Sequence, residues 1–207
     1  MVSDTLLDCV LGLDISTSIV GISCVTCSGE ILSTDSLILQ TNKLPTIWDK
    51  SKKYQDTIRQ LKEHFTQNRL RIKKISVEEA FKSFSAGRSS SDTISLLQQF
   101  NGIVCWITSQ EFDLYPTRMN VATARKLVGY KRKYYSVRYP DEKEKELVFR
   151  WGLSQWGNRI SWGQEAAAIL EENEILKCGQ KGIKKNWYDE MDSCVIAIAG
   201  CKQSNEV

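Results

Sequence analysis

The 207-residue chain has 42% hydrophobic and 26% charged residues and a net charge of +3, which excludes a disordered or polycationic protein. It contains no apolar run near the roughly 20 residues that cross a bilayer, and its first residues include acids where a targeting signal carries Arg or Lys. We therefore expect a soluble, intracellular protein with no membrane contact, located in the cytoplasm or nucleoid, with an organelle not excluded.

The cysteines and the single histidine argue against two classes of site. The seven cysteines are odd in number and scattered through apolar runs, as at Cys24, Cys105 and Cys194, so we expect reduced thiols rather than a disulfide framework. Cys24 and Cys27 have the spacing of a redox or zinc pair, but no second pair accompanies them. His64 lies in a charged helical pattern, so nothing indicates a Ser-His-Asp or Cys-His catalytic system.

The N-terminal half predicts three strands, a helix and a fourth strand. Residues 9–27 hold two apolar runs separated by a polar turn, and 30–40 supply a third run, as in an antiparallel meander. Apolar residues at helical spacing predict an amphipathic helix at 48–67. The segment 71–81 turns from basic to apolar and then acidic, which indicates a buried strand that ends at carboxylates.

The C-terminal half is mainly helical. Residues 129–139 combine basic residues with tyrosines, and we expect a loop there. The resulting order of strands and helices is that of an α/β domain with a mixed sheet. The other expected elements are a loop at 83–92, a strand at 114–121, and helices at 92–111, 122–128, 141–156, 164–176 and 188–201.

Acidic residues stand at the ends of three apolar elements. Asp14 ends the first strand and Glu78 the fourth, while Asp189 and Asp192 open the last helix on one face of it. Strand ends in α/β sheets gather at one crevice, where four carboxylates would repel each other unless divalent cations neutralised them. Oxygen ligands without a nearby His favour Mg²⁺ or Mn²⁺, and two such ions about 4 Å apart suit in-line attack on a phosphodiester.

Each acid also has a simpler explanation. Asp14 could cap its turn through Ser16 and Thr17, and Glu78 could be solvated at a strand end. The two acids of the last helix could serve only its dipole. The coincidence of all three motifs in this order favours the metal site.

Three ordered motifs resemble those of a known family. The run 11–16 resembles a first-strand motif in which a Gly usually stands at the position of Ser16, and 77–81 resembles an Ile-Glu-x-x-Phe segment. Residues 189–199 resemble a closing Asp-x-x-Asp helix with an apolar continuation, and the expected helix at 92–111 also fits. The chain thus resembles the RuvC-type Holliday junction resolvases of the RNase H-like (retroviral integrase-like) superfamily.

The resemblance implies one α/β, RNase H-like nuclease domain over residues 1–207. Its five-stranded mixed sheet, with the first three strands antiparallel, would be flanked by helices, and a helical and basic insertion at about 157–187 would precede the last helix. The enzyme would use two Mg²⁺ or Mn²⁺ ions per site and leave 5′-phosphates at paired nicks. The helix at 92–111 would contribute to a homodimer that acts on a four-way DNA junction. The implied metal-binding and catalytic residues are Asp14, Glu78, Asp189 and Asp192.

DNA contacts are expected from two regions. Phe81 matches the aromatic residue that family members insert into the junction centre, although it could instead close the core. The basic and aromatic residues of 129–139 suit a DNA surface, because cations neutralise phosphates and rings stack on bases, but a solvated loop would have the same composition. The basic loop at 131–133, followed by Lys143 and Lys145, lies where the family has catalytic or DNA-contacting lysines, but the local pattern does not show which lysine faces the scissile phosphate. The DNA-binding candidates are Phe81, Arg88, Lys131, Arg132, Lys133 and Lys143.

Three other functions share parts of this pattern. A kinase of the actin-like ATPase superfamily has a similar first strand, but it usually needs a longer chain and a later Gly-rich phosphate loop. The chain could also be a catalytically inactive RNase H-like binding module, but the presence of all four acids argues against this. A related nuclease acting on forks or RNA remains open, because substrate choice depends on dimer geometry and loops.

Overall fold

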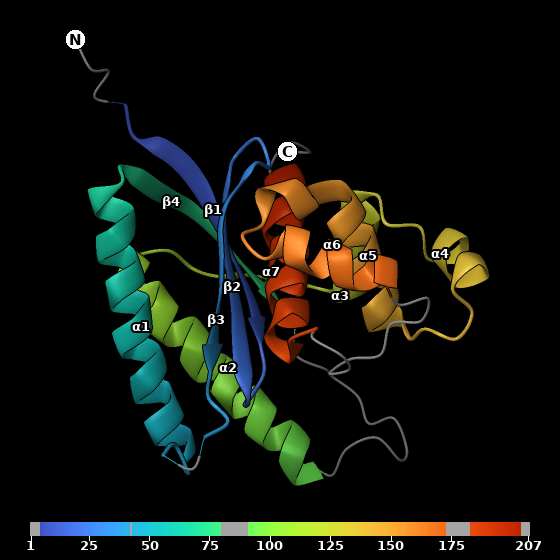
Figure 1. Ribbon diagram of the computed structural model, residues 1–207. Helices are drawn as coiled ribbons and strands as arrows, with labels where there is room; N and C mark the ends of the chain where they lie inside the picture. Colours follow the sequence, from blue (N-terminus) through green and yellow to red (C-terminus); the bar gives the residue numbers. More distant parts are fainter. Residues whose placement is uncertain (1–4, 42, 80–90, 173–182, 204–207) are drawn as a thin grey trace.

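The computed structural model describes residues 5–41, 43–79, 91–172 and 183–203. A five-stranded sheet lies between two helical layers (Figure 1). None of the described helices has both the length and the hydrophobicity needed to cross a membrane. The strands are β1 (Leu7–Ile15), β2 (Ile19–Thr26), β3 (Ile31–Ile38), β4 (Leu70–Glu78) and β5 (Thr117–Met119).

The sheet has the order β3-β2-β1-β4-β5, with β1 at its centre. β1 and β2 are antiparallel, as are β2 and β3, whereas β4 is parallel to both β1 and β5. This confirms the predicted mixed sheet with an antiparallel first half. The parallel pairing also brings the C-terminal ends of β1 and β4 to the same edge of the sheet.

The helices form layers of unequal depth on the two faces. α1 and α2 cover one face, α7 covers the other, and α3, α5 and α6 lie beyond α7, with α4 outermost (Figure 1). The helices are α1 (Ile47–Gln67), α2 (Ser91–Phe112), α3 (Val121–Val128), α4 (Arg132–Arg138), α5 (Glu144–Trp156), α6 (Gly163–Glu172) and α7 (Lys185–Gln203), with a short 3-10 turn at Gly157–Arg159.

β1 alternates between two cores, as the period of a strand requires. Cys9, Leu11 and Leu13 pack toward α1 and α2, whereas Val10 belongs to the core that contains α7. α7 is buried along residues 187–201, because the sheet lies on one side of it and helices on the other. An apolar, small-residue helix such as this one is suited to a position between two layers.

Three of the predicted elements differ from the structure, and the first is the strand expected at 114–121, which is limited to β5 (Thr117–Met119). Residues 132–138 form the helix α4, not a loop; α4 has no buried residue, so it lacks the apolar periodicity that predicts a helix. α7 begins at Lys185, before the predicted start, and no acid lies in its first turn. Asp189 and Asp192 are therefore inside the helix, and the dipole explanation for them is wrong.

The thiols agree with the prediction of reduced cysteines. Cys24 and Cys194 are buried and free, and Cys105 is half-buried and free. Cys27 is exposed at the end of β2 and is also free. No disulfide framework therefore contributes to the described part of the fold.

Candidate active site

Two glycines allow α7 to lie directly on the sheet. A Cβ atom on Gly21 would lie 2.1 Å from the carbonyl oxygen of Asp189, and one on Gly12 would lie 2.4 Å from that of Ser193. Only glycine permits so close an approach of two backbones. Because Gly21 pairs with Asp14 across β1 and β2, the contact brings the second turn of α7 against Asp14.

Asp14 and Glu78 meet at the ends of two parallel strands. Leu13 pairs with Val77, so the acids that follow them are neighbours, close enough for Glu78 to raise the pKa of Asp14. The buried Asn101 of α2 donates a long hydrogen bond, 3.5 Å, to the main-chain carbonyl of Glu78. The end of β4 is thus held from the α2 side while its acid faces Asp14.

Two cations lie against the acids of α7. Lys145 Nζ is 2.7 Å from Asp189 Oδ1, and Arg125 Nη2 is 3.5 Å from Asp192 Oδ1. Arg125 also lies near Glu144, with Nη1 3.7 Å from Oε1. The structure therefore brings together the four acids predicted from sequence and adds a cation from α3 and another from α5.

The crowding of carboxylates changes the pKa values of the site. Burial, followed by the charges of Glu78 and Asp192, raises the pKa of Asp14 well above its ordinary value. Burial also raises the pKa of Asp192 to about 6, against the opposing effects of Arg125 and Lys145. Burial alone would lower the pKa of Lys145, but the surrounding carboxylates outweigh it and raise this pKa. The site thus has an excess of negative charge that a further cation would relieve.

The turn that follows Asp14 does not depend on it for a cap. Ser16 Oγ donates to the carbonyl of Ile19 at 2.8 Å and accepts from the N–H of the same residue at 3.0 Å. Lys50 Nζ, from α1, donates to the carbonyl of Thr17 at 2.7 Å. Ser16 therefore closes the turn, which leaves the Asp14 carboxyl for its contact with Glu78.

Glu190 lies between the candidate acids but is engaged elsewhere. Its carboxylate accepts hydrogen bonds from Ser36 Oγ at 2.7 Å, from Asn186 Nδ2 at 3.0 Å and from the indole N–H of Trp162. Trp162 also stacks on Trp187, with ring centroids 5.1 Å apart, and both rings are buried. These residues of the expected insertion pack against α7 and fix the turn that carries the acids.

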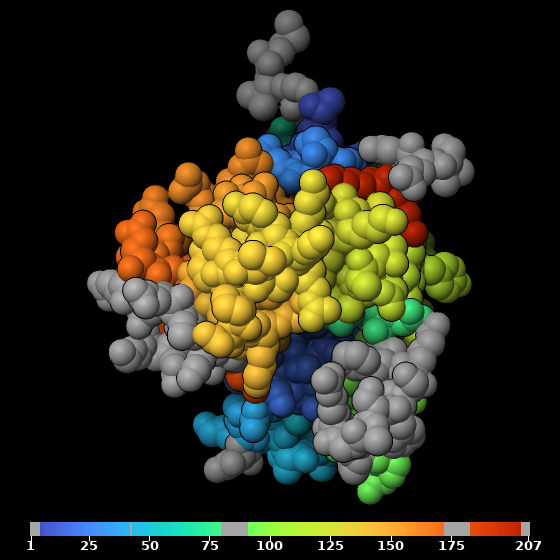
Figure 2. All heavy atoms as spheres, turned by 90° about the vertical axis from the view of Figure 1, so that its right-hand side faces the viewer, coloured from blue at the N-terminus to red at the C-terminus, as the bar shows by residue number. Residues whose placement is uncertain are grey.

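The predicted DNA-binding residues lie around α4 and the start of α5. Lys131, Arg132, Lys133 and Lys143 are all exposed, and Arg132 Nε also lies 2.7 Å from Glu144 Oε2. In Figure 2 the yellow α4 region faces the viewer, and dark blue atoms of the β1–β2 region lie set back below it. The two other candidates, Phe81 and Arg88, lie outside the described residues.

Sequence reasoning missed the role of Arg125 and left that of Lys145 open. Arg125 is one basic residue on a short helix, and no motif marks it. Lys145 stands two positions after Lys143, and only the fold shows which of them faces the acids: Lys145 contacts Asp189, while Lys143 is the exposed N-cap residue of α5.

The candidate acids offer oxygen ligands of the kind that bind divalent metals. Within the described ranges, no group of three or more His, Cys, Asp or Glu side chains is arranged as a ready metal site. Two of the four acids are instead paired with Lys145 and Arg125. The donors themselves fit Mg²⁺ or Mn²⁺, because they are carboxylate oxygens, the hard ligands that these ions prefer.

Comparisons with known proteins agree with this geometry at the level of the fold. No protein-family model matches the chain, and no curated protein matches it. The structure of Thermus thermophilus RuvC in complex with a Holliday junction substrate matches with a TM-score of 0.56 and 10% identity, over 95% of this chain and 94% of the other. A second Thermus thermophilus RuvC structure matches with a TM-score of 0.53 and 11% identity, over 95% of each chain.

The chain has an RNase H-like fold of the RuvC type. A third structure, the yeast mitochondrial Holliday junction resolvase Ydc2, aligns over 99% of this chain and 83% of the other with 16% identity, but its TM-score of 0.48 adds no weight. The RuvC-like fold agrees with the resemblance inferred from the three motifs. At 10–11% sequence identity, the match to the RuvC structures shows a shared architecture alone.

Proposed function

We propose that this protein is a metal-dependent endodeoxyribonuclease that resolves four-way DNA junctions by paired nicks leaving 5′-phosphates. The observation that carries the proposal is the meeting of four carboxylates, from β1, β4 and α7, at one edge of a RuvC-like sheet. Asp14, Glu78, Asp189 and Asp192 would be the catalytic and metal-binding residues. Thermus thermophilus RuvC, which shares the fold, has been captured with a Holliday junction substrate.

The acids would hold two Mg²⁺ or Mn²⁺ ions, which when bound would activate water and stabilise charge on the scissile phosphate. The side chain of Lys145 is 40% exposed and touches Asp189, so it can reach a phosphate placed over the acids. We assign to it the neutralisation of a non-bridging phosphate oxygen. Arg125 would keep Asp192 oriented, since its guanidinium contacts both Asp192 and Glu144.

A homodimer would place two such sites on opposite strands of a junction. α2 supplies a surface for it, because Trp106 is 62% exposed and Leu96 42% exposed on this helix. A dimer contact on this helix would remove both apolar side chains from water, which favours association. The DNA itself would be held by Lys131, Arg132, Lys133 and Lys143, together with Phe81 and Arg88.

A substrate panel tests the proposal. Labelled four-way junction, fork, duplex, single strand and RNA are incubated with the protein in Mg²⁺ or Mn²⁺, with EDTA as the control. We expect symmetric cuts in the junction and little cleavage of duplex. Preferential cutting of forks or RNA would favour the alternative RNase H-like nuclease, and ATP-dependent phosphorylation of a small substrate without nuclease activity would favour the kinase.

A further inference from the structure

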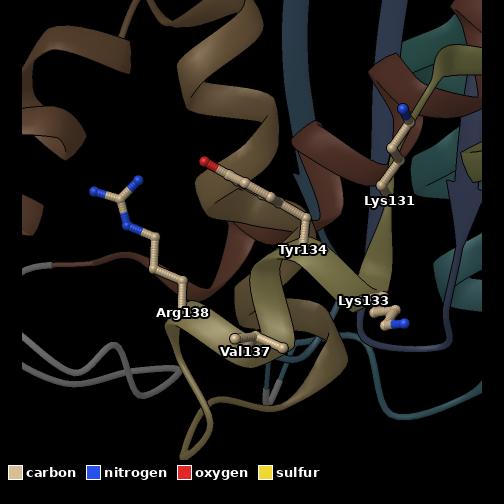
Figure 3. A pocket seen from close by; sticks show the side chains of 5 residues that line it. All are labelled: Lys131, Lys133, Tyr134, Val137 and Arg138. Atoms are coloured by element: carbon tan, nitrogen blue, oxygen red, sulfur yellow. The ribbon is translucent and has the colours of Figure 1, made fainter.

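The outward side of α4 combines cations with exposed apolar groups. Lys131, Lys133, Tyr134, Val137 and Arg138 line a shallow hollow of about 500 Å³. Tyr134 is 60% exposed and Val137 76% exposed. Figure 3 shows Arg138 on one side, the two lysines on the other, and Tyr134 and Val137 between them. The hollow thus has an aromatic and aliphatic centre flanked by positive charge.

The inward side of α4 is already used for packing. Arg132 Nε lies 2.7 Å from Glu144 Oε2, and Tyr135 stacks on Tyr130 with ring centroids 6.0 Å apart. The ion pair joins α4 to α5, and the ring contact joins α4 to the segment that precedes it. Arg132 and Tyr135 thus form an anchoring set. The residues that line the hollow form an outward set: Lys131, Lys133, Tyr134, Val137 and Arg138.

Ion pairs connect this helix to the acids. Arg132 contacts Glu144, Glu144 contacts Arg125, and Arg125 contacts Asp192. Because each step joins neighbouring side chains, α4 lies close to the acid cluster, and Figure 2 shows the α4 region directly above atoms of the β1–β2 region. A strand bound in the hollow could therefore continue to the acids.

We propose that the hollow binds an unpaired nucleotide, with its base against Tyr134 and Val137 and its phosphates against Lys131, Lys133 and Arg138. The cations are complementary to phosphate, and stacking on a ring tolerates any base. A duplex presents phosphates but keeps its base faces stacked, so it would gain nothing from the exposed ring. The inference rests on the proposed function and deepens it by naming unpaired DNA next to the scissile strand as the ligand.

Binding titrations separate this site from a general phosphate surface. The 207-residue chain carrying Asp14→Asn, to prevent cutting, is titrated into a fluorescent single strand and into a duplex of equal length. Tyr134→Ala should weaken single-strand binding at least about fivefold, with duplex binding changed less than about twofold. Lys133→Ala should weaken both ligands and reduce the salt slope by about one. Tyr115→Ala removes a ring that is 94% exposed elsewhere and serves as the matched control.

Two further variants keep the test decisive. Tyr134→Phe should bind as the parent does, and Tyr134→Leu, which preserves apolar contact with the adjacent Tyr135 ring, should show the same selective loss as Tyr134→Ala. If Tyr134→Ala lost equal affinity for duplex and single strand, or lost none, the hollow would not be a site for an unpaired nucleotide. Failure of the unmodified protein to cut any junction would overturn the proposed function while leaving the single-strand result intact.

Discussion

Gly21 illustrates how a single residue without a side chain builds the acid cluster. Its Cα faces the main chain of α7 at Asp189, where a methyl group would overlap the carbonyl oxygen. The same contact sets the distance between Asp14 on β1 and the acids of α7, because Gly21 pairs with Asp14. The position of α7 therefore depends on the lack of a side chain at Gly21 as well as on the side chains that pack around the helix.

We expect Gly21→Ala to be strongly destabilising. The methyl group can fit only if α7 moves, and such overpacking costs about 1–3 kcal/mol or more of unfolding free energy. Denaturant unfolding measures the loss. Gly102→Ala is the control: nothing lies within 4 Å of the added Cβ atom in α2, so helix propensity should make it neutral or stabilising by about 0.5–1 kcal/mol. Equal stability of the two variants would contradict the close contact.

The raised carboxyl pKa values predict a pH-dependent stability. The pKa of Asp192 is about 6 in the folded protein, above that of an unfolded Asp, so the folded state binds more protons between about pH 4 and 6. The free energy of unfolding should therefore fall as pH rises through this window when EDTA is present. Thermal unfolding of Asp192→Asn should show a smaller fall, and Mg²⁺ should reduce the fall in the unmodified protein. A fall of the same size in Asp192→Asn would show that other groups cause it.

At the scale of elements, the strands were easier to predict than the site they form. The two apolar runs in 9–27 predicted β1 and β2, and the acids after apolar runs predicted the candidate ligands, because these signals are local. The helix α4 gave no such signal, since none of its residues is buried. The meeting of Asp14 with Asp189 depends on contacts between distant segments, which no spacing in the sequence can show.

The polar anchor on α7 predicts an energetic role for the region before that helix. Trp162→Phe keeps a ring between Phe149 and Trp187 but removes the N–H that bonds the buried Glu190. A hydrogen bond to a charged group contributes about 1.5–3 kcal/mol, so unfolding free energy should fall by that amount. Trp156→Phe is the control, because this ring packs edge-on against Trp151 and against two apolar clusters, so the substitution also exchanges one buried ring for another.

A loss in Trp162→Phe no greater than in Trp156→Phe would mean that the ring stack alone holds this region. If the hydrogen bond matters, junction cleavage by Trp162→Phe should also decline, because Glu190 and Asp189 occupy the same turn of α7.

At the scale of the whole molecule, the proposed dimer would place one active site on each of two opposite strands, so that the two cuts are symmetric. Trp106→Glu should shift a dimer to monomers in analytical ultracentrifugation, because a buried, unpaired carboxylate is costly in an interface. Trp48→Glu is the matched control: Trp48 is 72% exposed and lies on α1. Dissociation by Trp48→Glu but not by Trp106→Glu would move the interface from α2 to α1.

Cleavage of a cruciform plasmid tests the central claim most directly, since only paired nicks across the junction linearise it. With Mg²⁺ present, we expect the unmodified protein to produce linear plasmid with 5′-phosphate ends. Asp14→Asn should bind the junction with similar affinity and cut at least about 100-fold more slowly, the scale of losing one electrostatic component of an active site. Linearisation by Asp14→Asn and Asp192→Asn at the rate of the unmodified protein would contradict the assignment of these acids.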